Sequence, residues 1–277
     1  MNDSPLYLVP FDFSAVAESA LRLGLDLAIA NNGSVILVHI ASSHSDKIET
    51  KLKFKEFAKT LSEDDAKLVT MKTIVGDVYE DINKAAELLE ASLIVMGTHG
   101  AKGFQKIFGS HAVKMISYSV TPFLITQGKK TVDKIKTIVM PFSFEKKSIQ
   151  IATFANKMAK KFNATIHLVG YHDKDSLLES HSRTNQIVVE KYFAAQGTDY
   201  VLGYIPKGAG FDEELMKYAA EVNADVLAAG YYKDGLITNP NSFIQSMIEN
   251  ELHIPVLTVN AEGLTVTDSS HSAATGY

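Results

Sequence analysis

The sequence predicts an α/β protein made of two tandem doubly wound parallel sheets, each with five strands and with helices on both faces. Short apolar runs alternate along the chain with stretches of helical periodicity, which is the pattern of βαβ units. The chain also repeats itself, because three landmarks recur at a nearly constant offset: Pro10 and Pro141, Gly97 and Gly230, and Pro122 and Pro255. The length of 277 residues agrees with two domains of ordinary size.

The first copy begins with an apolar strand at residues 6–10. The helix that follows places Val16, Ala20 and Leu23 on one face. Ser14 is suited to cap the N-terminus of that helix. The other predicted elements of this copy are a strand at 35–40, a charged surface helix at about 45–62, a strand at 68–75, a helix at 79–89, a strand at 93–96, a glycine-rich loop at 97–109, a helix at 110–118 and a strand at 122–126.

The second copy repeats the same alternation. Its predicted elements are strands at 137–141, 164–170, 199–205, 225–229 and 255–259, and helices at 145–163, 174–196, 211–223 and 241–252. The sequence therefore predicts one domain over residues 1–128 and a second over 134–260, joined by a short polar linker. Residues 261–277 are rich in Ser, Thr, Gly and Ala without an apolar period, which predicts a flexible tail.

Composition excludes several classes of function. The net charge of −5 argues against duplex nucleic acid as the main partner, since phosphate contacts need clustered Lys and Arg. The absence of cysteine excludes disulfides, thiolate nucleophiles and Cys-type metal sites. The N-terminus lacks the pattern of a signal peptide, and the apolar runs are too short for a membrane span. We therefore expect a soluble cytoplasmic protein that binds neither nucleic acid nor membrane.

The loop after the fourth strand of the first copy is the main candidate site. It is glycine-rich from Gly97 to Gly109, and a helix begins at Gly109 and Ser110, where free N–H groups and the helix dipole favour an anion. Between Glu90 and Asp133 there is no acidic residue, and the same stretch holds five lysines: Lys102, Lys106, Lys114, Lys129 and Lys130. This charge pattern indicates an anionic ligand. A tight turn followed by a solvated lysine face is the alternative interpretation.

This loop resembles the signature of the universal stress protein family, Gly-x2-Gly-x9-Gly-(Ser/Thr). The match runs from Gly97 through Gly100 to Gly109 and Ser110, with one residue fewer before Gly109 than the signature has. The resemblance implies a sheet order of 3-2-1-4-5 and ATP, with or without Mg²⁺, as the ligand. It also implies an Asp after strand 1 and a backbone group after strand 2 on the adenosine, with the glycine loop on the phosphates. The matching positions are Pro10, Asp12, Ile40, Met96, Gly97, Gly100, Gly109, Ser110 and His111.

The second copy departs from the same signature. Ser143 stands where the first copy has Asp12, and Lys233 stands where it has Gly100. Phe243 replaces Ser110, so bulky residues occupy positions that need close backbone approach. We expect nucleotide binding in the first domain only. The second domain is then a structural partner that completes an internal pseudo-dimer.

Three functions stay open from the sequence. The first is an ATP-binding regulatory or stress-response protein that is not an enzyme, or at most a weak ATPase. The second is an interaction protein without nucleotide, whose strand-5 edges at 122–126 and 255–259 pair the two halves or two chains of a homodimer. The third is an enzyme that transfers an adenylate or phosphoryl group, for which Asp12 is the one obvious carboxylate. No catalytic residue or metal site is predicted, and His39 and His99 are interpreted mainly as polar residues at strand ends.

Overall fold

The computed structural model describes residues 4–98, 109–128, 134–142, 149–172, 177–206, 210–232 and 240–261. The first half contains β1 (Leu6–Pro10), α1 (Ala15–Asn31), β2 (Ser34–Ala41), α2 (His44–Ala58), α3 (Glu63–Leu68), β3 (Val69–Val75), α4 (Val78–Leu88), β4 (Leu93–Gly97), α5 (Gly109–Ser117) and β5 (Phe123–Thr126). The second half contains β6 (Thr137–Pro141), α6 (Ile151–Phe162), β7 (Thr165–His172), α7 (Leu177–Gln196), β8 (Tyr200–Pro206), α8 (Phe211–Glu221), β9 (Val226–Tyr231), α9 (Pro240–Ile248) and β10 (Val256–Asn260).

The strands form one ten-stranded sheet in the order β3-β2-β1-β4-β5-β10-β9-β6-β7-β8. Each half has the predicted order 3-2-1-4-5 with parallel pairing, which confirms the predicted fold class. The two five-stranded sheets are joined because β5 and β10 pair antiparallel at the centre. The strand-5 edges therefore pair the two halves, and neither is left free to pair with a second chain.

The junction between the halves has a local pseudo-two-fold axis. Leu124 pairs with Leu257, which is its own counterpart in the repeat. Two side-chain hydrogen bonds follow the same symmetry: Gln127 Nε2 donates to Asn250 O at 2.8 Å, and Asn260 Nδ2 donates to Ser117 O at 2.8 Å. The internal pairing is thus isologous, like the interface of a symmetric dimer.

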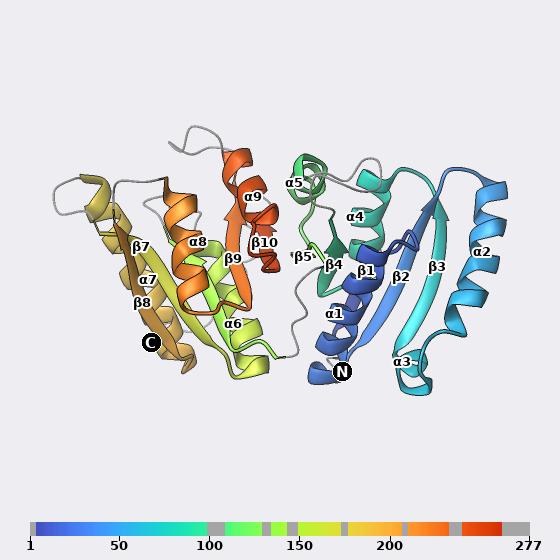
Figure 1. Cartoon of the computed structure of the whole chain (residues 1–277), viewed down its shortest axis with the longest axis horizontal. Coiled ribbons are helices and arrows are strands. Elements are labelled where there is room, and N and C mark those ends of the chain that lie inside the picture. Colours follow the sequence, from blue (N-terminus) through green and yellow to red (C-terminus); the bar gives the residue numbers. More distant parts are fainter. Residues whose placement is uncertain are drawn as a thin grey trace, which may run out of the picture.

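Helices cover both faces of the sheet (Figure 1). One face buries a core of side chains from α1, α2, α6 and α7, and the other buries a core from α4, α5, α8 and α9. The halves lie side by side in Figure 1, and α5 packs against α9 next to the β5–β10 junction. The inner strands β4, β5, β9 and β10 are buried almost throughout, which explains why they read as near-continuous apolar runs, whereas the outermost strand β3 has no fully buried residue.

One short helix was not predicted. The charged helix expected at about 45–62 ends as α2 at Ala58, and helix α3 follows between it and β3. Ser62 starts this new helix because its side chain accepts a hydrogen bond from the N–H of Asp65 at 3.1 Å. Asp65 also forms an ion pair with Arg22 of α1 at 3.3 Å, which ties α3 to the body of the domain.

The described residues extend slightly beyond the predicted second domain. Ala261, the first residue of the predicted tail, is buried, and its N–H donates to Tyr231 O at 2.8 Å. The rest of that tail, residues 262–277, lies outside the described residues. The division into domains at 1–128 and 134–260 stays a prediction.

Candidate functional site

Three of the predicted site residues meet on one face of the sheet at its carboxyl edge. Alternation along β1 places Pro10 on the same face as Leu8, which belongs to the core covered by α4 and α5. Ile40 at the end of β2 and Met96 near the end of β4 pack into that core as well. Met96 is 1% exposed, so its side chain lies beneath the surface of the edge.

Asp12 follows directly after β1 and is exposed to solvent. Its Oδ1 accepts a hydrogen bond from the N–H of Ser14 at 3.0 Å, which orients the carboxylate. Ser14 caps α1 as predicted, since its Oγ accepts from the N–H of Ala17 at 3.3 Å. The turn between strand and helix therefore presents one exposed carboxylate at the edge where ligands bind in open parallel sheets.

Aromatic rings hold this turn from the opposite face. Phe11 is buried and Phe13 is half-buried, and their ring centroids lie 5.2 Å apart. Both rings pack against Phe54 of α2, at 6.1 and 5.0 Å between centroids. Phe13 has a φ of 64°, an uncommon backbone conformation for a bulky residue. The packing of both rings on α2 keeps this conformation in place.

A histidine joins the ends of the two strands. His39 Nδ1 lies 2.7 Å from the carbonyl oxygen of Phe11, and because that oxygen only accepts, Nδ1 carries the proton. The ring lies on the face of Phe13 and Phe54, with its centroid 5.6 Å from that of Phe13. His39 therefore contacts the turn from the α2 face of the sheet, opposite the face that carries Pro10, Ile40 and Met96. His99, the other histidine considered, lies outside the described residues.

The loop after β2 has a further polar cluster that the sequence reasoning missed. Asp46 Oδ2 accepts from the N–H and the Oγ of Ser42 at 2.8 and 3.0 Å, and Ser43 Oγ accepts from the N–H of Asp46 at 3.2 Å. The bond from the Ser42 N–H is the main reason that the pKa of Asp46 is lowered. Ser-x-x-Asp spacing before α2 is the sequence signal for such a helix start.

Gly97 has a structural reason to be glycine. A Cβ atom at this position would lie 2.5 Å from the carbonyl oxygen of Val16 and 2.8 Å from its carbonyl carbon. These are backbone atoms of the first turn of α1, which cannot move aside as a side-chain end can. Gly97 thus permits close packing of β4 on α1, whatever its part in ligand binding.

Helix α5 starts at Gly109 at the same edge of the sheet, and its first turn contains no acidic residue. Two contacts fix it against α4: Asn83 Nδ2 donates to Met115 O at 3.0 Å in a buried position, and the ammonium of Lys114 lies 4.6 Å from the ring centroid of Tyr79. The first N–H groups of a helix have no partner within the helix, which is why a helix start favours an anion. Gly100 and the side chains of Ser110 and His111 lie outside the description.

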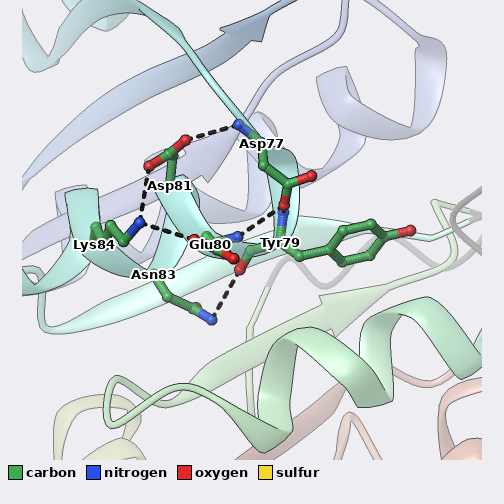
Figure 2. A network of polar contacts seen from close by, with 6 residues as sticks. All are labelled: Asp77, Tyr79, Glu80, Asp81, Asn83 and Lys84. Atoms are coloured by element: carbon green, nitrogen blue, oxygen red, sulfur yellow. Dashed lines mark hydrogen bonds and ion pairs between the residues drawn. The ribbon is translucent and has the colours of Figure 1, made fainter.

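The neighbouring helix α4 uses its own acidic residues for its cap (Figure 2). Asp77 Oδ1 accepts from the N–H groups of Tyr79 and Glu80 at 2.8 and 3.2 Å. Asp81 Oδ2 accepts from the N–H of Asp77 at 2.7 Å, and Lys84 pairs with Glu80 at 3.0 Å. Burial, with a smaller contribution from Asp77, raises the pKa of Tyr79. These carboxylates therefore serve the helix and its lysine.

Bulky buried side chains lie at the described part of the equivalent edge of the second half. Tyr231 and Tyr232, which stand where the first half has Thr98 and His99, are 2% and 6% exposed. Gly170 stands where the first half has His39, and the ring of Phe142 occupies the space where a Cβ would be. Ser143 and Lys233, two of the residues predicted to be unsuited to nucleotide, lie outside the described residues.

Within the described ranges, no group of three or more His, Asp or Glu side chains is arranged to hold a metal ion. None of the helices within those ranges is both long and apolar enough to cross a membrane.

This chain is similar to known proteins both in sequence and in fold. Residues 7–127 match the sequence model of the universal stress protein family. A universal stress protein from Archaeoglobus fulgidus DSM 4304 is 17% identical, and the match covers 94% of this chain and 99% of that chain with a TM-score of 0.72. A functionally unknown protein from Pseudomonas aeruginosa PAO1 is 15% identical over 93% of each chain, with a TM-score of 0.59. At these identities the likeness shows the fold, which extends over both halves.

A shorter protein also appears among the solved structures. It is a universal stress protein from Archaeoglobus fulgidus in complex with dAMP, which is 21% identical and covers 45% of this chain and 98% of that chain, with a TM-score of 0.37. No protein with a curated function matches the chain.

Proposed function

Because residues 7–127 form a universal stress protein domain, we propose that this protein binds ATP, with or without Mg²⁺, in its N-terminal half only. It then acts as a regulatory protein, and its family resemblance favours a role in stress response. The proposed site consists of Pro10, Asp12, Ile40, Met96, Gly97, Gly100, Gly109, Ser110 and His111.

One observation carries this proposal. The exposed carboxylate of Asp12 and the acid-free start of α5 lie at the same edge of one parallel sheet, after the adjacent strands β1 and β4. A carboxylate accepts hydrogen bonds from hydroxyl or amino groups, as adenosine offers, and a helix start attracts phosphate. Pro10 and Ile40 supply half-buried apolar surface on the same face, which suits a base.

The restriction to one half rests on the contrast in side-chain size. In the second half Tyr231 and Tyr232 are buried at the end of the fourth strand, where a ligand would need room. The tilted rings of Phe211 and Phe243 contact each other with centroids 5.9 Å apart, and Phe243 replaces Ser110 of the first half. These rings favour a structural role for the second half.

Binding is favoured over catalysis by the position of Asp12. A transfer enzyme needs a base or a metal-binding carboxylate beside the phosphates. Asp12 lies at the end of β1, already accepts from the N–H of Ser14, and corresponds to the adenosine end of the site. The interaction-protein alternative is supported by the β5–β10 pairing, which shows that these edges do join the halves.

Calorimetric titration of the full chain with ATP tests the proposal. We expect binding by the wild type and a loss of affinity on the order of tenfold or more for Gly109→Val, because a bulky residue would crowd the phosphate end. Ser143→Ala, at the position equivalent to Asp12 in the second half, is the matched control and should leave the affinity unchanged. Folded wild-type protein that shows no heat at millimolar ATP would remove the proposed function and leave the interaction protein.

A further inference from the structure

The hydrogen bond between His39 and Phe11 crosses from one strand end to the next. The sheet ladder reaches Phe11, whose N–H donates to Val38 O at 2.9 Å. Beyond this point the backbone leaves the sheet, and the His39 side chain provides the next connection by donating to Phe11 O at 2.7 Å. The carbonyl it holds belongs to the peptide bond that leads into Asp12.

The second half lacks the means to make this connection. Its equivalent of His39 is Gly170, which has no side chain, and the ring of Phe142 occupies the space above it. In the first half the ring of Phe11 instead packs against Phe57 of α2, at 4.7 Å between centroids. The two halves thus hold the same phenylalanine differently, and the half with the histidine is the half with the exposed carboxylate.

We propose that His39 is a positioning residue for the nucleotide site, which acts by fixing the Phe11–Asp12 peptide and hence the Asp12 carboxylate. This inference rests on the proposed function and deepens it. His39 lies on the α2 side of the sheet, whereas Pro10, Ile40 and Met96 lie on the α5 side, so it acts through the backbone without touching the ligand. It assigns a role in ligand affinity to a residue that faces away from the site.

Adenosine and ATP are titrated into the full-length wild type, His39→Ala and His39→Asn. His39→Ala should lower the affinity for both ligands by the same factor, about five- to tenfold, because the loss occurs at the adenosine end. His39→Asn should restore most of the affinity, since its amide Nδ2 branches from Cγ as the histidine Nδ1 does and can donate to the same carbonyl. His167→Asn is the matched control and should leave both affinities unchanged. Its Nδ1 makes a comparable hydrogen bond of 2.9 Å to the Tyr218 hydroxyl, but in the half without the proposed site.

A double-mutant cycle with Asp12→Ala separates positioning from general stability. If His39 acts through Asp12, adding His39→Ala to Asp12→Ala should cause less than a twofold further loss of affinity. An equal loss in both backgrounds, or equal affinities for wild type and His39→Ala, would overturn the inference while ATP binding by the wild type still stands. Failure of the wild type itself to bind would instead count against the proposed function.

Discussion

In the first half of the molecule β1 leads into the exposed carboxylate of Asp12, and β2 carries His39 behind it. In the second half the strand equivalent to β2 carries Gly170, and β9 ends in buried Tyr231 where Thr98 follows β4. The strand order is nevertheless the same in both halves. The topology depends on the apolar faces of the strands, so the residues at their carboxyl ends are free to differ.

The interface between the halves shows the opposite behaviour. There the two copies have kept matching roles, because Leu124 pairs with its counterpart Leu257 and two amide side chains bond across the junction. A duplicated protein therefore retains symmetry where its halves contact one another. It loses symmetry at the strand ends, where only one half carries a candidate site.

The largest expected effect is a loss of stability on substitution of Gly97, because this glycine is needed for packing whether or not it contacts a ligand. Gly97→Val should lower the free energy of unfolding by about 3 kcal/mol or more, since the new Cβ would lie 2.5 Å from Val16 O, a backbone atom. Gly24→Ala is the control, because its Cβ would meet only side-chain methyl groups, the nearest being Val9 Cγ2 at 3.2 Å, and it should change stability by less than about 1 kcal/mol. Urea unfolding measures both, and equal effects would contradict the close approach of β4 to α1.

A smaller effect is a dependence of stability on pH that β1 should contribute and its counterpart β6 should not. Burial raises the pKa of the Tyr7 phenol to about 12, although the hydrogen bond from Asn31 Nδ2 at 2.9 Å acts in the opposite direction. The equivalent residue in the second half is Ile138, which does not ionise. In the unfolded chain this phenol ionises near pH 10. The contribution of neutral Tyr7 to the free energy of unfolding is therefore complete below pH 10 and is lost as pH rises towards 12. The free energy of unfolding should fall by about 2–3 kcal/mol over this range.

Tyr7→Phe provides the comparison for this pH dependence. Phenylalanine keeps the ring but has no group to ionise, so urea unfolding between pH 9 and 12 should show a shallower decline in stability than the wild type. Parallel curves for the two proteins would show that Tyr7 is not the source of the decline.

The smallest effects test the symmetry of the junction. Gln127 Nε2 donates to Ile248 O at 3.0 Å as well as to Asn250 O, whereas the equivalent Asn260 donates to Ser117 O. Gln127→Ala and Asn260→Ala should each cost about 1–2 kcal/mol, because each removes a side-chain donor from main-chain carbonyl groups at the junction. Chemical denaturation measures both, and no loss of stability in either variant would contradict this account of the junction.

Much of the fold could be predicted because its signals are local. Apolar runs located the strands, and Ser14 located the start of α1, where its side chain does cap the helix. The end of α2 at Ala58 and the short helix α3 were missed, because Ser62 is one candidate cap among many polar residues in a charged stretch. Helix periodicity alone does not reveal where such a stretch is interrupted.

The candidate site could be predicted only as a set of positions. Sequence motifs selected Asp12 and the glycine loop, and strand alternation then brought Pro10, Ile40 and Met96 to one face. The contribution of His39 was not predicted, because its partner is a backbone carbonyl that is distant in sequence. The packing reason for Gly97 was missed for the same cause, since it depends on the approach of α1.

By itself the sequence determined the duplicated α/β architecture, because periodicity and spacing are properties of neighbouring residues. Tertiary structure decided that the two sheets join through β5 and β10 and that Tyr231 and Tyr232 are buried at the end of β9. It also decided which side of the sheet each strand-end residue occupies. Such contacts depend on how strands register and helices pack across long separations along the chain, which local patterns do not encode.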